Sequence, residues 1–229
     1  MSNPIVFDIE TRPGDQEEII HLLPPFDPSE VKVGNMKDPA LIAAKIKDAE
    51  EKHLSSFLEK AALSPDSGRV VAIGFIWDQG HEIISADSPG GEAKIISHFW
   101  QIFNQSRTGD AYQEMIGHNI IDFDLPFLVA RSWALGIEVP SLAYKIQRNG
   151  KFIAWSDNFI DTRLIFMMNR KEGRSSLDAV SRFFGLGGKD QSGKDFWAMF
   201  QKDRQAAIDY LKKDLDLTWG VAKKMGLIS

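Results

Sequence analysis

Near its N-terminus the chain reads Ile5-Val6-Phe7-Asp8-Ile9-Glu10-Thr11, and this stretch decides the fold. Apolar side chains alternate along it with a period of two, which is the pattern of a β-strand with two different faces. Its apolar character predicts a central, buried strand. Asp8 and Glu10 then point the same way, because side chains two residues apart share one face of a strand.

Two neighbouring carboxylates on a buried strand need a counter-charge. Like charges in a low-dielectric environment are costly unless a cation neutralises them. The chain contains no cysteine, so a metal ion would be held by oxygen or histidine ligands. Oxygen ligands favour Mg²⁺ or Mn²⁺. At a strand end the same two groups would simply face water, so this pair alone does not establish a metal site.

The composition is that of a globular protein. The chain of 229 residues is 43% hydrophobic and 26% charged, and its formal net charge is −5. We expect a single domain over residues 1–229. No apolar run is long enough to span a bilayer, and we expect no leader peptide, because the first predicted strand begins at about Pro4. We therefore expect a cytoplasmic protein with no membrane partner.

Charge is unevenly distributed along the chain. Residues 8–66 contain 13 acidic and 7 basic side chains, whereas residues 144–204 contain 12 basic and 7 acidic ones. The basic part indicates contact with a polyanion, although ordinary solvated surfaces would give the same counts.

Three further strands are predicted from the apolar periodicity. They lie at about 69–78, 81–86 and 115–119, and Asp78-Gln79-Gly80 marks a turn between the first two. A helix at 92–105 precedes the last of them, so that the order is β-β-β-α-β. Further helices are predicted at 125–135, 161–168, 176–184 and 204–225.

The connection between the first two strands is too long for a hairpin loop. We interpret residues 24–66 as a helical insertion, with a charged helix over 39–62. Such a segment is either a lid or binding element, or a helix that covers the sheet.

A second acidic element lies between the predicted strand and helix near residue 120. Asp124 stands just before that helix, with Pro126 in the first turn, where an aspartate commonly caps a helix. Capping and catalysis are compatible roles for one carboxylate. Asp122 is the competing candidate, but it lies nearer the end of the strand.

The last helix separates three neighbouring aspartates. At about 100° per residue, Tyr210 and Asp214 fall within the apolar arc of this helix. Asp209 and Asp216 fall on the opposite, lysine-rich side, which explains them as solvated charges. An aspartate on a core-facing stripe needs a cation or strong hydrogen-bond donors, and Tyr210 lies one turn away. Only Asp214 is therefore predicted to be functional.

These elements together resemble the three exonuclease motifs of the DEDD (DnaQ-like) superfamily. The motifs are Asp8-Ile9-Glu10 on the first strand, Asn119 followed by Phe123-Asp124, and Tyr210 followed by Asp214. The subtype is the tyrosine one, because the histidine subtype would place a histidine where Asp209 stands. The chain is most similar to the proofreading exonuclease domain of family-B DNA polymerases and to stand-alone proteins related to it.

The resemblance implies an α/β fold of the ribonuclease H-like kind, a mixed five-stranded sheet flanked by helices. It also implies two divalent metal ions, Mg²⁺ or Mn²⁺. Asp8 would bridge both ions, Glu10 and Asp214 would complete one site, and Asp124 would hold the other. Tyr210 would orient the attacking water.

The function implied by the resemblance is that of a metal-dependent 3′-5′ exonuclease. Its substrate would be a single-stranded or frayed 3′ end, of DNA in preference to RNA, and its products would be nucleoside 5′-monophosphates. A role in DNA repair would follow, with no partner protein identified by the residues.

Substrate contacts are expected from side chains near these motifs. Asn119 is expected to donate to a phosphate or ribose, and Phe123 either stacks on the terminal base or packs in the core. Trp155, Trp197 and Trp219 are predicted to pack. Candidates for contact with the backbone are Lys145, Arg148, Lys151, Arg170, Lys171 and Arg174.

Other functions are consistent with parts of this pattern. An endonuclease or RNA-processing exoribonuclease would share the fold, but the tyrosine motif argues against it. A catalytically inactive nucleic-acid-binding protein would have no reason to keep four carboxylates that repel phosphate. Only the basic region argues against a small-molecule phosphoesterase.

Overall fold

The structure is a computed structural model. It describes residues 4–77, 80–86, 91–105, 107–108, 111–141, 143–146, 152–171, 173–188 and 196–228. The chain divides into two compact units, unit 1 (Met1–Thr11 and Val70–Ser229) and unit 2 (Arg12–Arg69), and each is described by itself. All the predicted site residues belong to unit 1.

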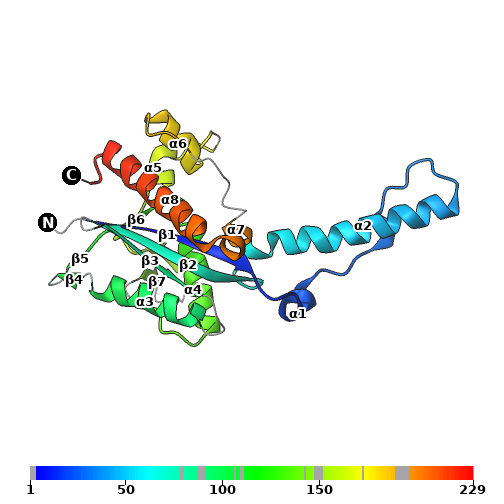
Figure 1. Cartoon of the computed structure of the whole chain (residues 1–229), viewed down its shortest axis with the longest axis horizontal. Helices are drawn as coiled ribbons and strands as arrows, with labels where there is room; N and C mark the ends of the chain where they lie inside the picture. Colours follow the sequence, from blue (N-terminus) through cyan, green and yellow to red (C-terminus); the bar gives the residue numbers. More distant parts are fainter. Residues whose placement is uncertain are drawn as a thin grey trace. The chain divides into compact units, whose positions relative to one another are not determined.

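Unit 1 is built on one mixed sheet (Figure 1). Its strands are β1 (Ile5–Pro13), β2 (Gly68–Trp77), β3 (Gly80–Ser85), β6 (Met115–Gly117) and β9 (Phe159–Asp161). The order of the strands in the sheet is β3-β2-β1-β6-β9. Strand β6 pairs in parallel with both β1 and β9, whereas β2 pairs antiparallel with β3. The expected five-stranded mixed sheet is confirmed. Two separate hairpins are β4 (Arg107–Thr108) with β5 (Ala111–Tyr112) and β7 (Tyr144–Ile146) with β8 (Phe152–Trp155).

Helices flank this sheet. They are α3 (Gly91–Gln105), α4 (Asp124–Ala134), α5 (Thr162–Met167), α6 (Leu177–Phe183), α7 (Phe196–Lys202) and α8 (Arg204–Lys224). The predicted helices are confirmed within a few residues at each end. The short helix α7 was not predicted.

The sheet has a different helical layer on each side. In Figure 1, α3 and α4 lie on one side and α8 lies on the other. The odd-numbered side chains of β1, from 5 to 9, belong to the core with α3 and α4. Val6 belongs instead to the cluster that contains Leu215 of α8. Because side chains alternate along a strand, Asp8 and Glu10 lie on the α8 side of the sheet.

A glycine on β2 allows α8 to lie close to the sheet. A Cβ atom at Gly74 would stand 2.7 Å from Cδ1 of Leu215 and 3.1 Å from Cγ of Leu211. Both leucines are buried on α8. The missing side chain on β2 therefore sets how closely α8 packs, and Asp214 lies between these two leucines in sequence.

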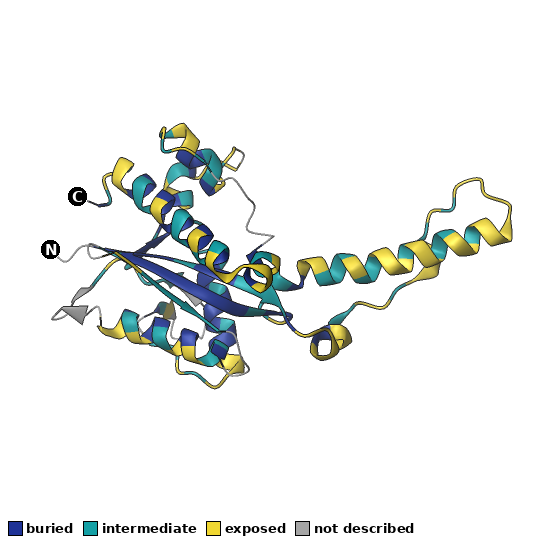
Figure 2. Ribbon diagram, in the orientation of Figure 1, coloured by how far each residue is buried: buried dark blue, intermediate teal, exposed yellow. Residues whose placement is uncertain are grey.

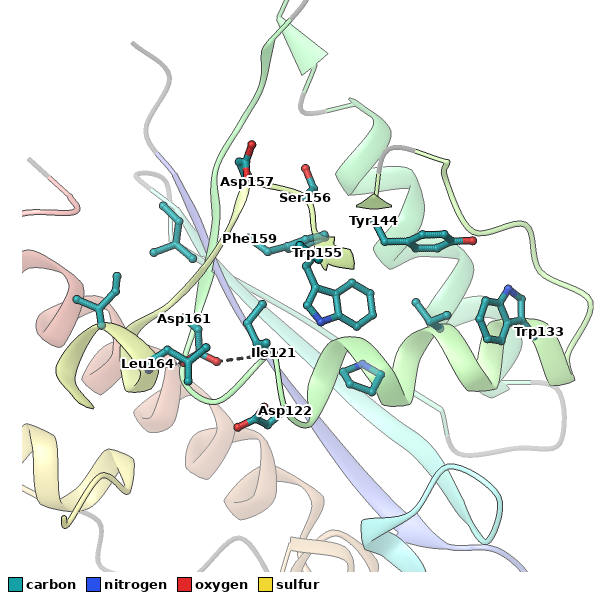
Figure 3. Close-up of a pocket in the computed structure, with 15 residues that line it drawn as sticks. Ile121, Asp122, Trp133, Tyr144, Trp155, Ser156, Asp157, Phe159, Asp161 and Leu164 are labelled. Carbon is teal, nitrogen blue, oxygen red and sulfur yellow. Dashed lines mark hydrogen bonds between the residues drawn. The ribbon is translucent and has the colours of Figure 1, made fainter. Parts of the chain in front are cut away.

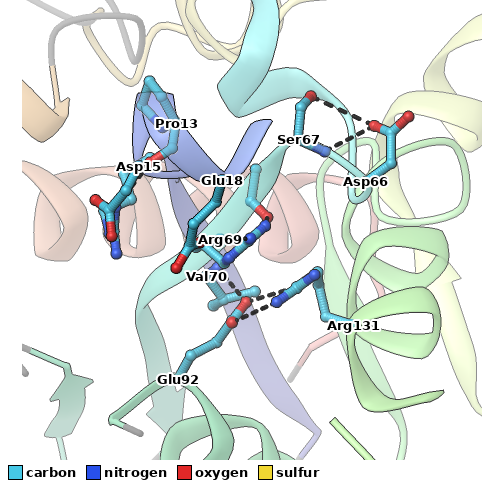
Figure 4. A network of polar contacts seen from close by, with 11 residues as sticks. Pro13, Asp15, Glu18, Asp66, Ser67, Arg69, Val70, Glu92 and Arg131 are labelled. Carbon is cyan, nitrogen blue, oxygen red and sulfur yellow. Dashed lines mark hydrogen bonds and ion pairs between the residues drawn. The ribbon is translucent and has the colours of Figure 1, made fainter. Parts of the chain in front are cut away.

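A buried ion pair joins α3, α4 and β2 (Figure 4). Arg131 donates from Nε and Nη2 to the two carboxylate oxygens of Glu92, at 2.9 and 2.8 Å. One of these oxygens also accepts from the backbone N–H of Val70 at 2.8 Å. The two side chains are only 9% and 12% exposed. A bidentate pair with a third hydrogen bond fixes these elements relative to one another.

Unit 2 consists of helices and their connections. They are α1 (Gln16–Ile19), η1 (Ile20–Leu22), η2 (Pro28–Glu30), α2 (Pro39–Lys60) and η3 (Ala61–Leu63). Asp38 caps α2 by accepting from the backbone N–H of Ala40 at 2.8 Å. No residue of α2 is buried, as the yellow and teal ribbon in Figure 2 shows. The helix predicted at 39–62 is confirmed, whereas the single domain over 1–229 with an insertion at 24–66 is retained as a proposal.

Sequence reasoning missed the strand β9. Its three residues, Phe159–Asp161, are too short to display a periodic pattern. The predicted turn at Asp78 and Gln79 lies outside the described residues. In the part of the chain that the structure describes, no helix combines the length and hydrophobicity required to cross a bilayer.

Candidate active site

Three of the predicted carboxylates meet on the α8 side of the sheet. Asp8 and Glu10 come from β1 and Asp214 comes from α8, and one oxygen atom of each lies within 4.8 Å of the others. Glu10 and Asp214 are 8% and 3% exposed, whereas Asp8 is half-buried. Strand alternation and helix register together therefore produce a compact acidic cluster.

This set of donors fits a hard divalent cation. Three carboxylates held this closely repel one another in partly buried surroundings, and a cation between them removes that cost. Mg²⁺ and Mn²⁺ prefer such oxygen ligands. The partial exposure of Asp8 leaves the cluster accessible from solvent.

Asp124 lies beside this cluster rather than within it. Its Oδ1 atom accepts a hydrogen bond from the backbone N–H of Ile9, the residue between Asp8 and Glu10, at 3.1 Å. The capping role considered for Asp124 is wrong, because α4 begins at Asp124 itself and Phe123 occupies the cap position. The carboxylate is engaged with β1.

The environment of Asp124 opposes its negative charge. Burial raises the pKa of Asp124 well above its ordinary value, and the charge of Asp8 raises this pKa further. The hydrogen bond from Ile9 acts in the opposite direction. A positive charge between Asp8 and Asp124 would favour the ionised form of both.

Tyr210 lies one helical turn before Asp214 and forms a side-chain hydrogen bond with it. Burial raises the pKa of Tyr210, and the charges of Asp214 and Glu10 raise this pKa further. The phenol therefore stays protonated at physiological pH and donates a hydrogen bond into the acidic cluster.

The helix argument that separated the aspartates of α8 is confirmed. Asp214 and Tyr210 are 3% and 8% exposed. Asp209 is exposed and accepts from the side chain of Gln205 at 2.9 Å, and Asp216 is exposed and pairs with His81. Only one of the three aspartates faces the carboxylates of β1.

Asp161 organises the loop that carries Asn119, and sequence reasoning missed it. Its carboxylate accepts from the backbone N–H groups of Asn119 and Ile121, both at 3.0 Å. It also caps α5 by accepting from Arg163 and Leu164. Asn119 has a positive φ of 71°, a conformation that needs such support. The signal in the sequence was an aspartate directly before a helical pattern.

A polar cleft of about 470 Å³ opens beside Asp8. It is lined by Asp8, His118, Asn119, Arg163, Ser175, Ser176 and Leu177. Asn119 thus shares a cleft with a carboxylate of the acidic cluster, as its expected contact with substrate requires.

The other predicted substrate contacts have different surroundings. Phe123 packs against the main core, with its ring centroid 5.6 Å from that of Phe127, and its contact with substrate stays a prediction. Arg148 and Lys151 lie outside the described residues. Lys145 is paired with Asp157. Trp155, Trp197 and Trp219 pack against the hydrophobic clusters, as predicted.

A family model described as a predicted 3′-5′ exonuclease related to the exonuclease domain of PolB matches residues 62–229. The chain belongs to this family. No curated protein matches this chain. The matched residues include Asn119, Asp124, Tyr210 and Asp214 but not β1. The structure places Asp8 and Glu10, which lie outside the matched residues, next to Asp214, which lies within them.

A solved structure similar to this chain is that of the family B DNA polymerase from the hyperthermophilic archaeon Pyrobaculum calidifontis. The TM-score is 0.60 at 18% sequence identity, and the match covers 98% of this chain and 24% of the polymerase. The chain thus spans about a quarter of that polymerase's length. This likeness supports the expected ribonuclease H-like fold.

Proposed function

We propose that the chain is a metal-dependent 3′-5′ exonuclease that removes nucleotides from a single-stranded or frayed 3′ end and releases nucleoside 5′-monophosphates. The observation that carries the proposal is the meeting of the Asp8, Glu10 and Asp214 oxygens within 4.8 Å in a member of this exonuclease family. DNA is the preferred substrate in this proposal. The relation to PolB and the likeness to a DNA polymerase support that preference.

The acidic residues would hold two divalent ions, Mg²⁺ or Mn²⁺. Asp8, Glu10 and Asp214 would hold one ion, and Asp8 with Asp124 would hold the other. When bound, the ions would stabilise negative charge on the scissile phosphate and lower the pKa of a water molecule. The position of Asp124 beside the three-carboxylate cluster, joined to Ile9, supports this division of roles.

The chain's own side chains would position the reacting groups. The protonated hydroxyl of Tyr210 would orient the attacking water next to Asp214. Asn119, held by Asp161 on the wall of the cleft, would contact a phosphate or ribose of the terminal nucleotide. Asp161 acts on the reaction only through Asn119 and its loop, so it is a positioning residue.

The proposal is tested with 5′-labelled single-stranded DNA and RNA of the same sequence, in Mg²⁺, Mn²⁺ or EDTA. The expected result is a ladder that shortens from the 3′ end, faster on DNA, and that disappears in EDTA. A 3′-phosphate should slow the reaction strongly. Full activity in EDTA would contradict the metal site.

Controls distinguish the competing functions. Asp214→Asn, purified in the same way, reports contamination by other nucleases. Cleavage of a circular single strand would indicate an endonuclease, and faster degradation of RNA would indicate an exoribonuclease. Binding without any cleavage would indicate an inactive protein of the same fold. If small phosphodiesters are hydrolysed while oligonucleotides remain uncleaved, the protein is a small-molecule phosphoesterase.

A further inference from the structure

Two large apolar side chains are exposed to solvent, one directly after α5 and the other at the last residue of α6. Met168 and Phe183 are 79% and 71% exposed. The Phe183 ring makes edge-on contacts with those of Phe166 and Phe184, with centroids 5.4 and 5.1 Å apart. These neighbours hold the ring in place without covering it. We call Met168, Arg170, Lys171, Arg174 and Phe183 the α5–α6 patch.

The same patch carries three basic side chains, Arg170, Lys171 and Arg174. The guanidinium of Arg170 lies 5.5 Å from the centroid of the Phe166 ring and donates to backbone carbonyls of Phe166 and Met167. Lys171 and Arg174 are exposed, and neither forms an ion pair with any residue that the structure describes. Asp178 of α6 is already paired with Arg182 at 3.0 Å. Residues 170–174 contain three basic side chains and one acidic one, so this segment carries a net positive charge that favours a negatively charged ligand.

The patch is anchored to the cleft that contains Asp8. Ser175, which follows Arg174, accepts at its carbonyl from Nε2 of His118 at 2.8 Å. Its hydroxyl accepts from Nε of Arg163 at 3.2 Å. His118, Arg163 and Ser175 all line the cleft. The cations therefore begin one residue from the cleft wall.

The α6 helix is held firmly in this position. Leu177 and Val180 of α6 pack with Leu217 and Val221 of α8, the helix that carries Asp214. Phe183 therefore projects from a helix that is fixed to the helix bearing a carboxylate of the candidate site. Preorganised aromatic side chains bind with little loss of conformational freedom.

We propose that the α5–α6 patch binds the nucleotides of a single strand upstream of its 3′ end, with a base stacked on Phe183 and phosphates on Lys171 and Arg174. This inference rests on the proposed function. Exposed aromatic rings interleaved with cations are the combination by which proteins hold single-stranded nucleic acid without reading its sequence. The patch explains how a strand is held while its terminal nucleotide enters the cleft.

A larger cavity of about 1170 Å³ suits a strand less well (Figure 3). Its walls include Trp133, Trp155 and Tyr144, but also Asp122, Asp157 and Asp161. The described residues that line it include no lysine or arginine; Lys145 pairs with Asp157 and Arg163 pairs with Asp122. Phosphate would meet carboxylates here. Trp133, which is 64% exposed on its wall, therefore provides a matched control for Phe183.

The test measures binding of labelled oligothymidylates of about three and about twelve nucleotides to the full chain in EDTA. Phe183→Ala should weaken binding of the longer strand at least about fivefold and leave the shorter one within about twofold. The double variant with Lys171→Ala and Arg174→Ala should also bind the longer strand more weakly. The slope of its log K against log salt concentration should be smaller in magnitude by about 1.4, because two phosphate contacts are lost. Trp133→Ala should bind as wild type does.

The outcomes separate this inference from the proposed function. The inference is overturned if the patch variants bind the longer strand as tightly as wild type does, or if Trp133→Ala weakens this binding as much as they do. This holds even when the wild-type protein degrades DNA. If Phe183→Ala weakens binding but the wild-type protein never shortens a strand, the binding surface stands and the proposed function fails. Melting temperatures equal to wild type confirm that the exposed substitutions leave the fold intact.

Discussion

The carboxylate of Asp124 accepts a hydrogen bond from the backbone N–H of Ile9 at 3.1 Å, across 115 residues of sequence. Ile9 lies between Asp8 and Glu10 on β1. This contact joins the first residue of α4 to the strand that supplies two carboxylates of the candidate site. Packing of α4 against the sheet therefore also sets the geometry of the site.

Replacement of Asp124 by asparagine should stabilise the metal-free protein at neutral pH. Because the fold raises the pKa of Asp124, the native state binds its proton more tightly than the unfolded chain does. Its contribution to stability is thus fully present below the ordinary carboxyl pKa and is lost as pH rises through the raised pKa. In EDTA, Asp124→Asn should melt above wild type at pH about 8, and the difference should shrink toward pH about 5.

In the presence of Mg²⁺, the wild-type protein should melt above Asp124→Asn, which is the reverse of the order expected in EDTA. Mg²⁺ should raise the melting temperature of the wild-type protein more than that of Asp124→Asn, because a ligand stabilises the state that binds it. Asp8→Asn should behave like Asp124→Asn, because the charge of Asp8 is one cause of the raised pKa. Both variants should lose turnover. A variant that melts well below wild type at every pH would show that its carboxylate is structural.

Substitution of the three aspartates of α8 should give unequal results. Asp214→Asn should lose at least about two orders of magnitude in exonuclease rate, as loss of a metal ligand or key electrostatic group commonly does. Asp209→Asn and Asp216→Asn should remain near wild type, because both side chains are exposed on the opposite side of α8. Initial rates on a 5′-labelled single strand provide the measurement. A silent Asp214→Asn with an inactive Asp216→Asn would refute the site.

Tyr210→Phe should lower the rate without unfolding the protein. The substitution keeps the buried ring, which packs in the cluster with Phe196, but removes the hydroxyl that bonds to Asp214. We expect a loss of about ten- to a thousandfold in kcat. The melting temperature should change little. A variant with full activity would remove Tyr210 from the mechanism.

Glu92→Gln should destabilise the fold far more than an equivalent change at the surface. It leaves Arg131 buried without its carboxylate and is expected to cost about 3 kcal/mol of unfolding free energy. Asp48→Asn, which removes an exposed pair with Lys52, should cost at most about 0.5 kcal/mol. Urea denaturation compares the two. Equal costs would mean that the Glu92 network contributes no more than a surface pair.

Much of the fold and of the candidate site could be predicted from local sequence patterns. The period of two in β1 placed Asp8 and Glu10 on one face, and the helical period of α8 distinguished Asp214 from Asp209 and Asp216. Such patterns are legible because the repeat of a strand or a helix determines which side chains share a face. The burial of Asp214 and the exposure of its neighbours confirm that interpretation.

Only the tertiary structure decided the features that depend on contacts between distant segments. The bond between Asp124 and Ile9, the support of Asn119 by Asp161, and the packing of α8 over Gly74 leave no repeat in the sequence. The strand β9, which ends at Asp161, is likewise too short to show one. Local periodicity reports the face of an element, whereas the partner of that face is chosen by long-range packing, which a single sequence does not display.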